Sequence, residues 1–587
     1  MVFTSGRPFL FKSILFACVV YFPSSFPTQV DYLEDSPTTV GNISSINTSS
    51  YDFDSSFKVS LPPAILQSFT YPAPLPQWQT GAAGAFASGA IDLGGLVVSQ
   101  TRNLTQAWNT STGNGATFFE PSSLPEGFFI LGSYAQPNNV PLFGGVLVAK
   151  DITGRSLRKP TDYALFWCSQ NNSKAGSDTT QPGYFWLPNC TAGYVAVGYL
   201  VTNTSNKPPL EKIRCVLSNF TNASVTAGDP IWSVDGVSIS TAMPQERGVQ
   251  ARALASCSFM IQASSTNLSS LPPQPACLRN ANQNFSCAAM PSKSQIQALM
   301  EAYGPLFYFH PNEKFLPSSV EWFFQNGALL RWKNGSSSEG GVPVWLNGSN
   351  LPLNGTGYWL DLPANATEKQ RVKKGDVENA TTYVHVKSMF GGTFTDMAVW
   401  VFYPFNGPAF VKIGKETISL ETIGEHTGDW EHVTLRINNF DGALESVFFS
   451  QHAGGVWVKA SQLEFWNGTN KPVVYASLHG HAAYPKAGEN LLGSGLVKIK
   501  NAAAIGKVSM DTGLNFTLLS AECLGDDAVV EPNWLNSSLA WGPTVIYAIA
   551  KELKFLQHKL PPELMHEQGP CSPKLKESWS LDEKCWN

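Results

Sequence analysis

Residues 424–452 read GEHTGDWEHVTLRINNFDGALESVFFSQH. The part from Trp430 to Ile437 alternates polar and apolar residues, as in a half-buried strand. Asp441-Gly442 is a strong signal for a tight hairpin turn, after which a second apolar run returns. If these two residues form the turn, Phe440 pairs with Ala443 and Glu431 lies opposite His452. The stretch therefore predicts a β-hairpin at the centre of a mainly β fold.

The composition supports β structure and excludes one class of partner. The chain has 587 residues, 14% charged and 12% aromatic, with 49 Gly and 40 Pro. This is poor in charge against an average of about 25%, and rich in turn-forming residues. The length indicates at least two hydrophobic cores. A formal charge of −5 without runs of Lys or Arg argues against a nucleic-acid partner.

The amino terminus has the pattern of a signal peptide, assigned to residues 1–25. Arg7 and Lys12 precede an apolar run from Ile14 to Phe22, which is too short for an ordinary membrane span. The alternative is an uncleaved anchor. No later segment approaches ~20 consecutive apolar residues, so we expect no transmembrane helix in the mature chain, which would be soluble or in peripheral contact with a membrane. Residues 26–64 are rich in Ser, Thr and Asn and predict a flexible lead-in.

Glycosylation sequons agree with entry into the secretory pathway, with the vacuole or the extracellular space as destination. Nineteen Asn-X-Ser/Thr sequons are spread over the chain: Asn42, Asn47, Asn103, Asn109, Asn171, Asn189, Asn203, Asn219, Asn222, Asn267, Asn284, Asn334, Asn347, Asn354, Asn365, Asn379, Asn467, Asn515 and Asn536. Their density predicts a heavily glycosylated surface.

Residues 65–290 predict a β-repeat domain held by disulfides. Gly127 and Gly132 in one segment correspond to Gly193 and Gly198 in another, which suggests a repeated unit whose faces pack against each other; coincidence among Gly-rich hairpins is the alternative. Nine cysteines follow the signal peptide, six of them between 168 and 287. In an oxidising compartment most should pair, in a connectivity that the sequence leaves open.

Residues 291–560 predict a β-sandwich domain with a few helices. Ile296, Leu299, Met300 and Tyr303 have helical spacing. Further helices are expected from about residue 318 and over 543–560, and His310 and Glu313 are interpreted as polar groups of a surface turn. Two expected capping boxes are Ser294 to Gln297 and Ser318 to Glu321. The tail 561–587 is expected to be tied down by Cys571 and Cys585.

Six polar residues form a candidate metal site. Asp429 and Glu431 are two apart on one strand and share a face, and Gly428 permits a bend that brings His426 to them. The hairpin adds one histidine and a third strand end adds two. The predicted ligands are His426, Asp429, Glu431, His452, His479 and His481. This mixed nitrogen and oxygen set suits one divalent ion, Mn²⁺, Zn²⁺, Fe²⁺ or Mg²⁺. Alternatively, these groups only cap loops and bond to the backbone.

The motifs FHPNEKFLPSSVEWFF, GEHTGDWEHVTLRI, SQHAGGVW and SLHGHAAYP resemble the plant and fungal vacuolar protein sorting-associated protein 62 family over residues 300–545. The 126–209 repeat resembles a β repeat of the vacuolar sorting-associated protein 13 family of lipid-transfer proteins. HTGDWE is similar to the core motif of the necrosis- and ethylene-inducing peptide-like proteins, secreted β-sandwiches that hold a divalent ion and bind sphingolipid headgroups. This resemblance implies metal-coordinating roles for His426, Asp429 and Glu431. The chain departs from the toxins at Gly428, where they have a second His.

These features favour a non-enzymatic secretory or vacuolar glycoprotein that uses a metal to bind a lipid headgroup or a glycan. Trp430, Trp457 and Tyr484 are candidates for stacking on sugar rings. The family name implies a role in vacuolar protein targeting. One alternative is a divalent-metal-dependent hydrolase with His481 or His452 as general base; the sequence offers no nucleophile elbow or phosphate loop in support of it. Another is a membrane-active protein like the toxins.

Overall fold

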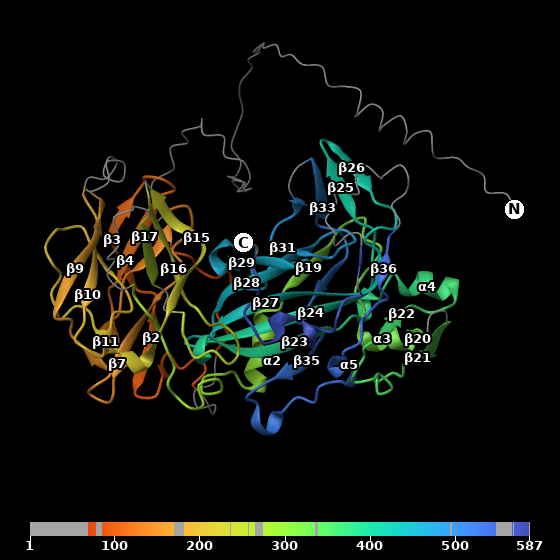
Figure 1. Cartoon of the computed structure of the whole chain (residues 1–587), viewed down its shortest axis with the longest axis horizontal. Helices are drawn as coiled ribbons and strands as arrows, with labels where there is room; N and C mark the ends of the chain where they lie inside the picture. The colour runs from red at the N-terminus through yellow and green to blue at the C-terminus, as the bar shows by residue number, and fades with distance from the viewer. Residues whose placement is uncertain are drawn as a thin grey trace, which may run out of the picture. The chain divides into compact units, whose positions relative to one another are not determined.

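The computed structural model describes residues 68–77, 85–169, 181–234, 236–255, 258–263, 274–334, 338–493, 496–547, 566–567 and 569–585. The expected signal peptide and lead-in lie outside this part of the chain. Residues 61–587 form one compact unit. The mainly β prediction is confirmed, with short antiparallel sheets dominating the unit (Figure 1). The division into domains at residues 290 and 560 stays a prediction.

Strands before residue 280 pair only with one another among the described residues, in six small sheets. The sheets are, in spatial order, β1 (Ile91–Asp92), β2 (Leu96–Thr101), β7 (Val146–Asp151), β5 (Phe129–Ile130); β3 (Leu104–Thr110), β4 (Ala116–Pro121), β6 (Tyr134–Pro137); β11 (Tyr194–Val195), β13 (Cys215–Leu217), β8 (Leu157–Arg158); β12 (Leu200–Thr202), β10 (Tyr184–Asn189), β9 (Asp162–Cys168); β14 (Thr221–Asn222), β18 (Cys277–Leu278); and β15 (Ser224–Val234), β16 (Val237–Pro244), β17 (Phe259–Ala263).

The two glycines that repeat in the sequence meet in space. A Cβ built on Gly132 would lie 2.9 Å from Gly198 Cα, and one built on Gly198 would lie 2.8 Å from Gly132 Cα. The neighbouring backbones are joined as well, because the Ser133 amide donates to the Tyr199 carbonyl over 2.8 Å. Only residues without a side chain allow this approach. The repeated segments therefore pack face to face at their glycines.

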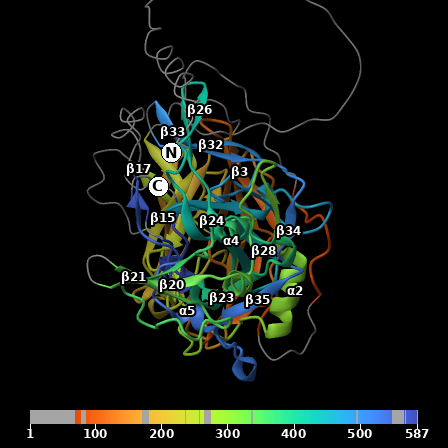
Figure 2. The same cartoon turned by 90° about the vertical axis from the view of Figure 1, so that its right-hand side faces the viewer.

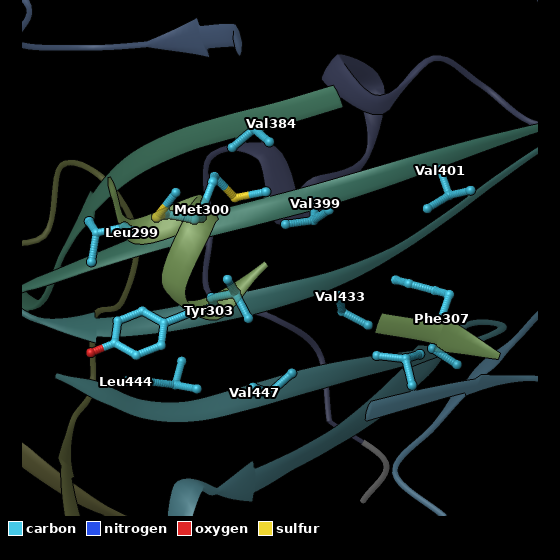
Figure 3. Packing of buried hydrophobic residues seen from close by; sticks show 14 of the residues in the cluster. Leu299, Met300, Tyr303, Phe307, Val384, Val399, Val401, Val433, Leu444 and Val447 are labelled. Atoms are coloured by element: carbon cyan, nitrogen blue, oxygen red, sulfur yellow. The ribbon is translucent and has the colours of Figure 1, made fainter. Parts of the chain in front are cut away.

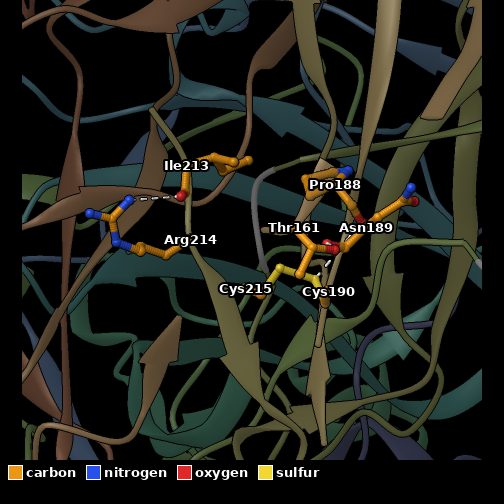
Figure 4. The surroundings of a disulfide bond; sticks show 7 residues. All are labelled: Thr161, Pro188, Asn189, Cys190, Ile213, Arg214 and Cys215. Atoms are coloured by element: carbon orange, nitrogen blue, oxygen red, sulfur yellow. Dashed lines mark hydrogen bonds between the residues drawn. A yellow bond between two sulfur atoms is a disulfide. The ribbon is translucent and has the colours of Figure 1, made fainter. Parts of the chain in front are cut away.

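Two disulfides lie in the described part of the chain. Cys190–Cys215 joins two of the small sheets near Thr161, whose hydroxyl donates to the Asn189 carbonyl over 3.0 Å (Figure 4). Cys287–Cys523 joins residues 236 apart. Bridges between distant residues constrain the unfolded chain most strongly. These bridges use four of the eight described cysteines that follow the signal peptide, fewer than the expectation that most would pair.

The largest sheet has six strands in the order β29 (Gly454–Lys459), β28 (Leu444–Gln451), β27 (His426–Asn438), β24 (Phe394–Asn406), β23 (Thr382–Met389) and β35 (Phe516–Ala521). All pairs are antiparallel except β23 with β35. Both strands β24 and β27 have 13 residues, and they are buried along almost their whole length. This pair is the framework of the candidate site.

One face of this sheet packs on a helix and a second sheet. Helix α2 (Lys293–Tyr303) contributes Leu299, Met300 and Tyr303 to the core, against Val399 and Val433 of the large sheet (Figure 3). The second sheet has the order β31 (Ala483–Tyr484), β30 (Val473–Ala476), β19 (Leu306–Phe309), β34 (Ser509–Asp511). Two sheets sharing one core is the arrangement of a sandwich.

The opposite face is covered by short helices and a small sheet with an aromatic core. Its elements are α3 (Val320–Gln325), α4 (Ala366–Val372), α5 (Asn533–Asn536), and the sheet β21 (Ser338–Pro343), β20 (Leu329–Asn334), β22 (Tyr358–Asp361). Trp400 and Trp430 of the large sheet pack there with Trp534 and Trp541. Because both faces of the sheet are covered, β24 and β27 are buried along nearly their whole length.

The hairpin and both helix caps differ from the predictions by one or two residues. Val433 pairs with Phe449 and Leu435 with Val447, and a bulge follows Arg436. In this register Glu431 does not lie opposite His452, because the Gly442 amide bonds to the Asn438 carbonyl and makes the turn longer than two residues. The capping box of α2 is Ser292 with Gln295, and Ser319 caps α3.

The carboxyl terminus is held by polar contacts. Among the described residues Cys571 and Cys585 form no disulfide; instead Glu583 is buried against the large sheet, where Thr434 Oγ1 donates to it over 2.6 Å. The helix expected over 543–560 begins as a strand, since β36 (Val545–Ile546) pairs with β37 (His566–Glu567). Most of that segment lies outside the described residues. No helix in the described part of the chain is long and apolar enough to cross a membrane.

Candidate functional site

The alternation of β27 sorts its polar side chains onto two faces. Val433 packs in the core shared with α2, and residues two apart share a face, so Asp429 and Glu431 lie on that side of the sheet. His432 points the other way, where its ring stacks on Trp400 with centroids 4.1 Å apart. The prediction that Asp429 and Glu431 share a face is confirmed.

Gly428 begins the site and accepts no larger residue in this backbone. Its φ is +67°, and a Cβ there would lie 2.3 Å from the Trp541 carbonyl oxygen. L residues with side chains rarely adopt such a φ. The toxins' second histidine at this position is therefore incompatible with the present backbone.

Asp429 and His481 form a buried pair. His481 Nδ1 lies 2.9 Å from Asp429 Oδ2, and His481 Nε2 lies 2.9 Å from the Phe315 carbonyl oxygen. Burial alone would lower the pKa of His481, but the Asp429 bond and the nearby Glu313 carboxylate raise it above its usual value. Burial likewise opposes ionisation of Asp429, while the His481 bond and the charge of His426 lower its pKa. The pair is thus set up as an imidazolium and a carboxylate.

Glu431 is the partner carboxyl group of Asp429. The Ser450 hydroxyl donates to Glu431 Oε2 over 2.6 Å. Burial, and then the Asp429 charge, raise the pKa of Glu431 to about 8. Two acids sharing a desolvated site cannot both ionise easily, so a cation would be stabilised between them. Glu431 is only half-buried, which leaves it accessible.

The remaining three predicted ligands, His426, His452 and His479, bond to groups other than the two acids. His426 Nδ1 bonds to the Gly428 carbonyl over 2.6 Å, and His452 Nε2 lies 3.3 Å from Asn501 Oδ1. His479 Nδ1 bonds to the Pro408 carbonyl over 3.1 Å, and its ring packs between aromatic side chains. His452, His479 and His481 have φ values of 56°, 69° and 53°. Left-handed backbone at non-glycine residues costs energy and is concentrated at functional sites.

The nitrogen and oxygen donors of these residues are of the types that bind divalent ions. Their positions in space are less suitable for holding one ion. A histidine whose Nδ1 proton bonds to a backbone carbonyl, as in His426, presents the tautomer that metal sites use. Within the described ranges, however, no three His, Cys, Asp or Glu side chains are grouped so that they hold one ion. Both nitrogens of His481 are engaged by acceptors. Of the predicted ligands, Asp429 and Glu431 share one face of β27, and His481 bonds to Asp429 and so positions it.

Sequence reasoning missed one carboxylate of the site. Glu313, expected at the surface, has a side chain only 2% exposed, and its Oε2 lies 4.0 Å from His481 Nε2. Its Oε2 accepts the His479 amide over 2.6 Å. The only signal was its place in FHPNEKFLP, a motif shared with the family. Two of the proposed stacking residues, Trp430 and Tyr484, are core residues instead.

The sequence profile described as vacuolar protein sorting-associated protein 62 matches residues 65–583. No curated protein matches the chain.

Several solved structures show a distant resemblance. GNIP1Aa from Chromobacterium piscinae is 17% identical, with 36% of this chain and 40% of that chain covered and a TM-score of 0.28. Necrosis and Ethylene inducing Protein 2 from the agent of cocoa's Witches Broom disease is 14% identical, with coverage of 32% and 67% and a TM-score of 0.18. NLPPya in complex with glucosamine is 12% identical, with coverage of 43% and 92% and a TM-score of 0.21. This chain spans less than half the length of the first of them.

Proposed function

Because this chain belongs to the vacuolar protein sorting-associated protein 62 family, we propose that it is a secretory or vacuolar glycoprotein that binds a lipid headgroup or a glycan through a divalent metal ion at Asp429 and Glu431. A role in vacuolar protein targeting, which the family name suggests, belongs to the same proposal. The pair of neighbouring acids carries it: Glu431 has a pKa of about 8 beside Asp429, and a bound cation would remove that repulsion.

The surroundings of the pair support binding. Glu431, His426 and His479 are partly exposed while Asp429 and His481 are buried, so ligand atoms could reach one side of the cluster. Three histidines in left-handed conformations indicate that the backbone is strained to present this group. A bound ion would neutralise the carboxylates and offer coordination positions to hydroxyl or phosphate oxygens. His481 would keep Asp429 ionised and oriented.

The test is elemental analysis of the secreted protein, after dialysis against Mn²⁺, Zn²⁺, Fe²⁺ or Mg²⁺, beside Asp429→Asn/Glu431→Gln. We expect about one equivalent of one ion in the wild type and none in the variant. Asp526→Asn/Asp527→Asn is the matched control, because it removes two adjacent carboxylates that are exposed. Binding of phosphocholine, inositol phosphate and N-acetylglucosamine is then measured by calorimetry with the ion present and after chelation. A wild type that stays empty with every ion would overturn the metal proposal.

A further inference from the structure

A four-stranded sheet contacts the candidate site. Its order is β26 (Glu416–Ser419), β25 (Phe410–Ile413), β33 (Val497–Ala503), β32 (Gly488–Leu492), and we call residues 410–419, 488–493 and 496–503 the arm. Strands β26 and β33 lie at the same end of the molecule in both views (Figures 1 and 2). Ile413 pairs with both Glu416 and Val497, so the turn at Gly414-Lys415 and the residue Leu496 lie together at one end. This end is the arm tip.

The base of the arm belongs to the candidate site. Asn501 of β33 lies 3.3 Å from His452 Nε2, and the ring of Phe410 in β25 lies 5.2 Å from that of His479. Asn501 is four residues from Val497, so the tip end of β33 lies about 13 Å from Asn501 at ~3.3 Å per strand residue. A surface that the tip touches would therefore lie close to the site as well.

The arm is basic in an acidic chain. It carries four lysines (412, 415, 498 and 500) and two glutamates (416 and 489), while the whole chain has a charge of −5. Lys412 and Lys500 both contact Glu489, at 2.5 Å each. Lys498 pairs directly across the sheet from Lys412, and like charges that lie opposite each other on two strands are unfavourable. Lys415 is exposed at the tip.

The tip also exposes an apolar side chain. Leu496 is 74% exposed, and Leu491, Leu492 and Ile413 beside it are partly buried. An exposed leucine at the same end of the sheet as Lys415 and Lys498 is suited to an interface with apolar and anionic layers, as at a membrane surface.

The arm is free of sequons, unlike another apolar surface. Trp345, Leu346 and Leu353 are exposed to 62%, 58% and 74%, but sequons lie beside them at Asn347 and Asn354, where attached glycans would cover them. The sequence has no sequon between Asn379 and Asn467 or between Asn467 and Asn515. On a protein with nineteen sequons, the arm is thus a surface on which close contact with a partner is not blocked.

We propose that the arm docks on anionic lipid membranes, with Lys415 and Lys498 contacting headgroups and Leu496 entering the interface. This goes beyond the proposed function, because it requires neither the metal nor a specific headgroup. Docking would place the base of the arm, and with it Asp429 and Glu431, next to the headgroup layer. Lysines near an anionic surface contribute about 1 kcal/mol each.

The experiment is co-sedimentation of the glycosylated, secreted protein with phosphatidylcholine vesicles that contain or lack phosphatidylserine, in chelator. We expect binding only with phosphatidylserine, and weaker binding at high salt. Lys415→Gln/Lys498→Gln should bind about 30-fold more weakly, because it removes two lysines that contribute about 1 kcal/mol each. Leu496→Asp should also lose binding.

Matched controls separate the arm from general effects. Leu353→Asp has the same 74% exposure as Leu496 but lies among sequons, and Lys293→Gln/Lys374→Gln removes two exposed charges elsewhere; both should bind like the wild type. Equal binding to vesicles without phosphatidylserine, no binding at all, or arm variants that behave like the controls would each overturn the proposal. Because chelator is present, none of these outcomes depends on the metal site.

Discussion

The imidazole of His481 bridges the Asp429 carboxylate and the Phe315 carbonyl, with both nitrogen to oxygen distances at 2.9 Å. Both neighbours are acceptors, so each ring nitrogen must carry a proton to bond with them. His481 is therefore an imidazolium, fully buried and paired with one carboxylate. The positive charge inside the sheet exists only because Asp429 and, more distantly, Glu313 compensate it.

Replacing His481 with Gln should destabilise the protein through Asp429. The variant keeps a donor but removes the cation, which leaves a buried carboxylate with no opposite charge bonded to it; breaking such a pair costs about 3–5 kcal/mol. The measurement is the free energy of unfolding from urea denaturation at neutral pH. His310→Gln, in a more exposed turn, is the control and should change it by much less. An equal effect of both variants would contradict the buried ion pair.

Glu431 should make stability fall as pH rises. The pKa of this group in the folded protein is about 8, raised by burial and by Asp429 from 4.5. The folded state therefore binds the proton more tightly than the unfolded chain. The stabilisation from that proton is complete below about pH 4.5 and is lost as pH rises through about 8. In chelator, the melting temperature of Glu431→Gln should fall less between pH 5 and 9 than that of the wild type; parallel curves would contradict the raised pKa.

Gly428→Ala should be strongly destabilising, and Gly480→Ala should not. The first change places a Cβ 2.3 Å from the Trp541 carbonyl oxygen at a φ of +67°, and backbone strain of this kind alone costs about 1–3 kcal/mol. At Gly480 the nearest atom would be His452 Cε1 at 3.8 Å, an ordinary contact. The melting temperatures of the two variants show whether the loss of stability comes from the backbone conformation of Gly428 or from any substitution near the site. Similar losses would show that any added methyl group disturbs the cluster.

Local pattern was enough to find the framework of the fold but not its register. Alternation placed Asp429 and Glu431 on one face of β27, and helical spacing located α2. The predicted strand register was wrong because the Gly442 amide donates a hydrogen bond to the Asn438 carbonyl. This bond makes the turn longer than the two residues that the Asp-Gly turn rule assumes. A shift of one residue in a hairpin moves a side chain to the other face, so His452 could not be placed from sequence.

The candidate site was predictable where it lies on one strand and not where it depends on distant loops. Glu313 is 166 residues from His479 and reaches it through an unpatterned loop, so no periodicity reports the contact. The buried charges of the carboxyl terminus were missed for the same reason. Arg436 of β27 pairs with Asp396 and with Asp582 of the carboxyl-terminal segment. A charged residue on a strand normally predicts a solvent-exposed position, so the sequence did not indicate that a second segment covers this one.

Glu583 should hold the carboxyl terminus on the sheet. Its carboxylate accepts from Thr434 Oγ1 over 2.6 Å, and lies 3.2 Å from His432 Nε2 and 3.8 Å from Lys387 Nζ. Burial opposes its charge, but His432 and Lys387 lower its pKa to about 2. Glu583→Gln should cost about 3 kcal/mol, measured by denaturation at neutral pH.

Acid titration supplies an independent check on Glu583. Because its pKa is depressed in the folded state, its contribution is complete above the unfolded value of about 4.5 and is lost as pH falls through about 2. Glu583→Gln should therefore lose less stability than the wild type between pH 5 and 2. Glu577→Gln, which changes an exposed carboxylate of the same segment, should follow the wild type. An acid profile of Glu583→Gln identical to that of the wild type would rule out the depressed pKa.

Adding one methyl group at the contact of Gly132 with Gly198 should destabilise the protein. Neither residue has a positive φ, so Ala is allowed by the backbone and any loss comes from contact with the opposing chain. Overpacking of this kind costs about 1–3 kcal/mol. Gly132→Ala and Gly198→Ala should each lower the free energy of unfolding. The double variant should lose less than the sum of the two, because the first methyl group already separates the backbones. Gly193→Ala is the control for backbone strain without steric contact, since the φ of Gly193 is +85° and a Cβ there would have nothing within 4 Å. Additive losses of stability in Gly132→Ala and Gly198→Ala would mean that the two glycines respond independently and that the repeated segments do not meet there.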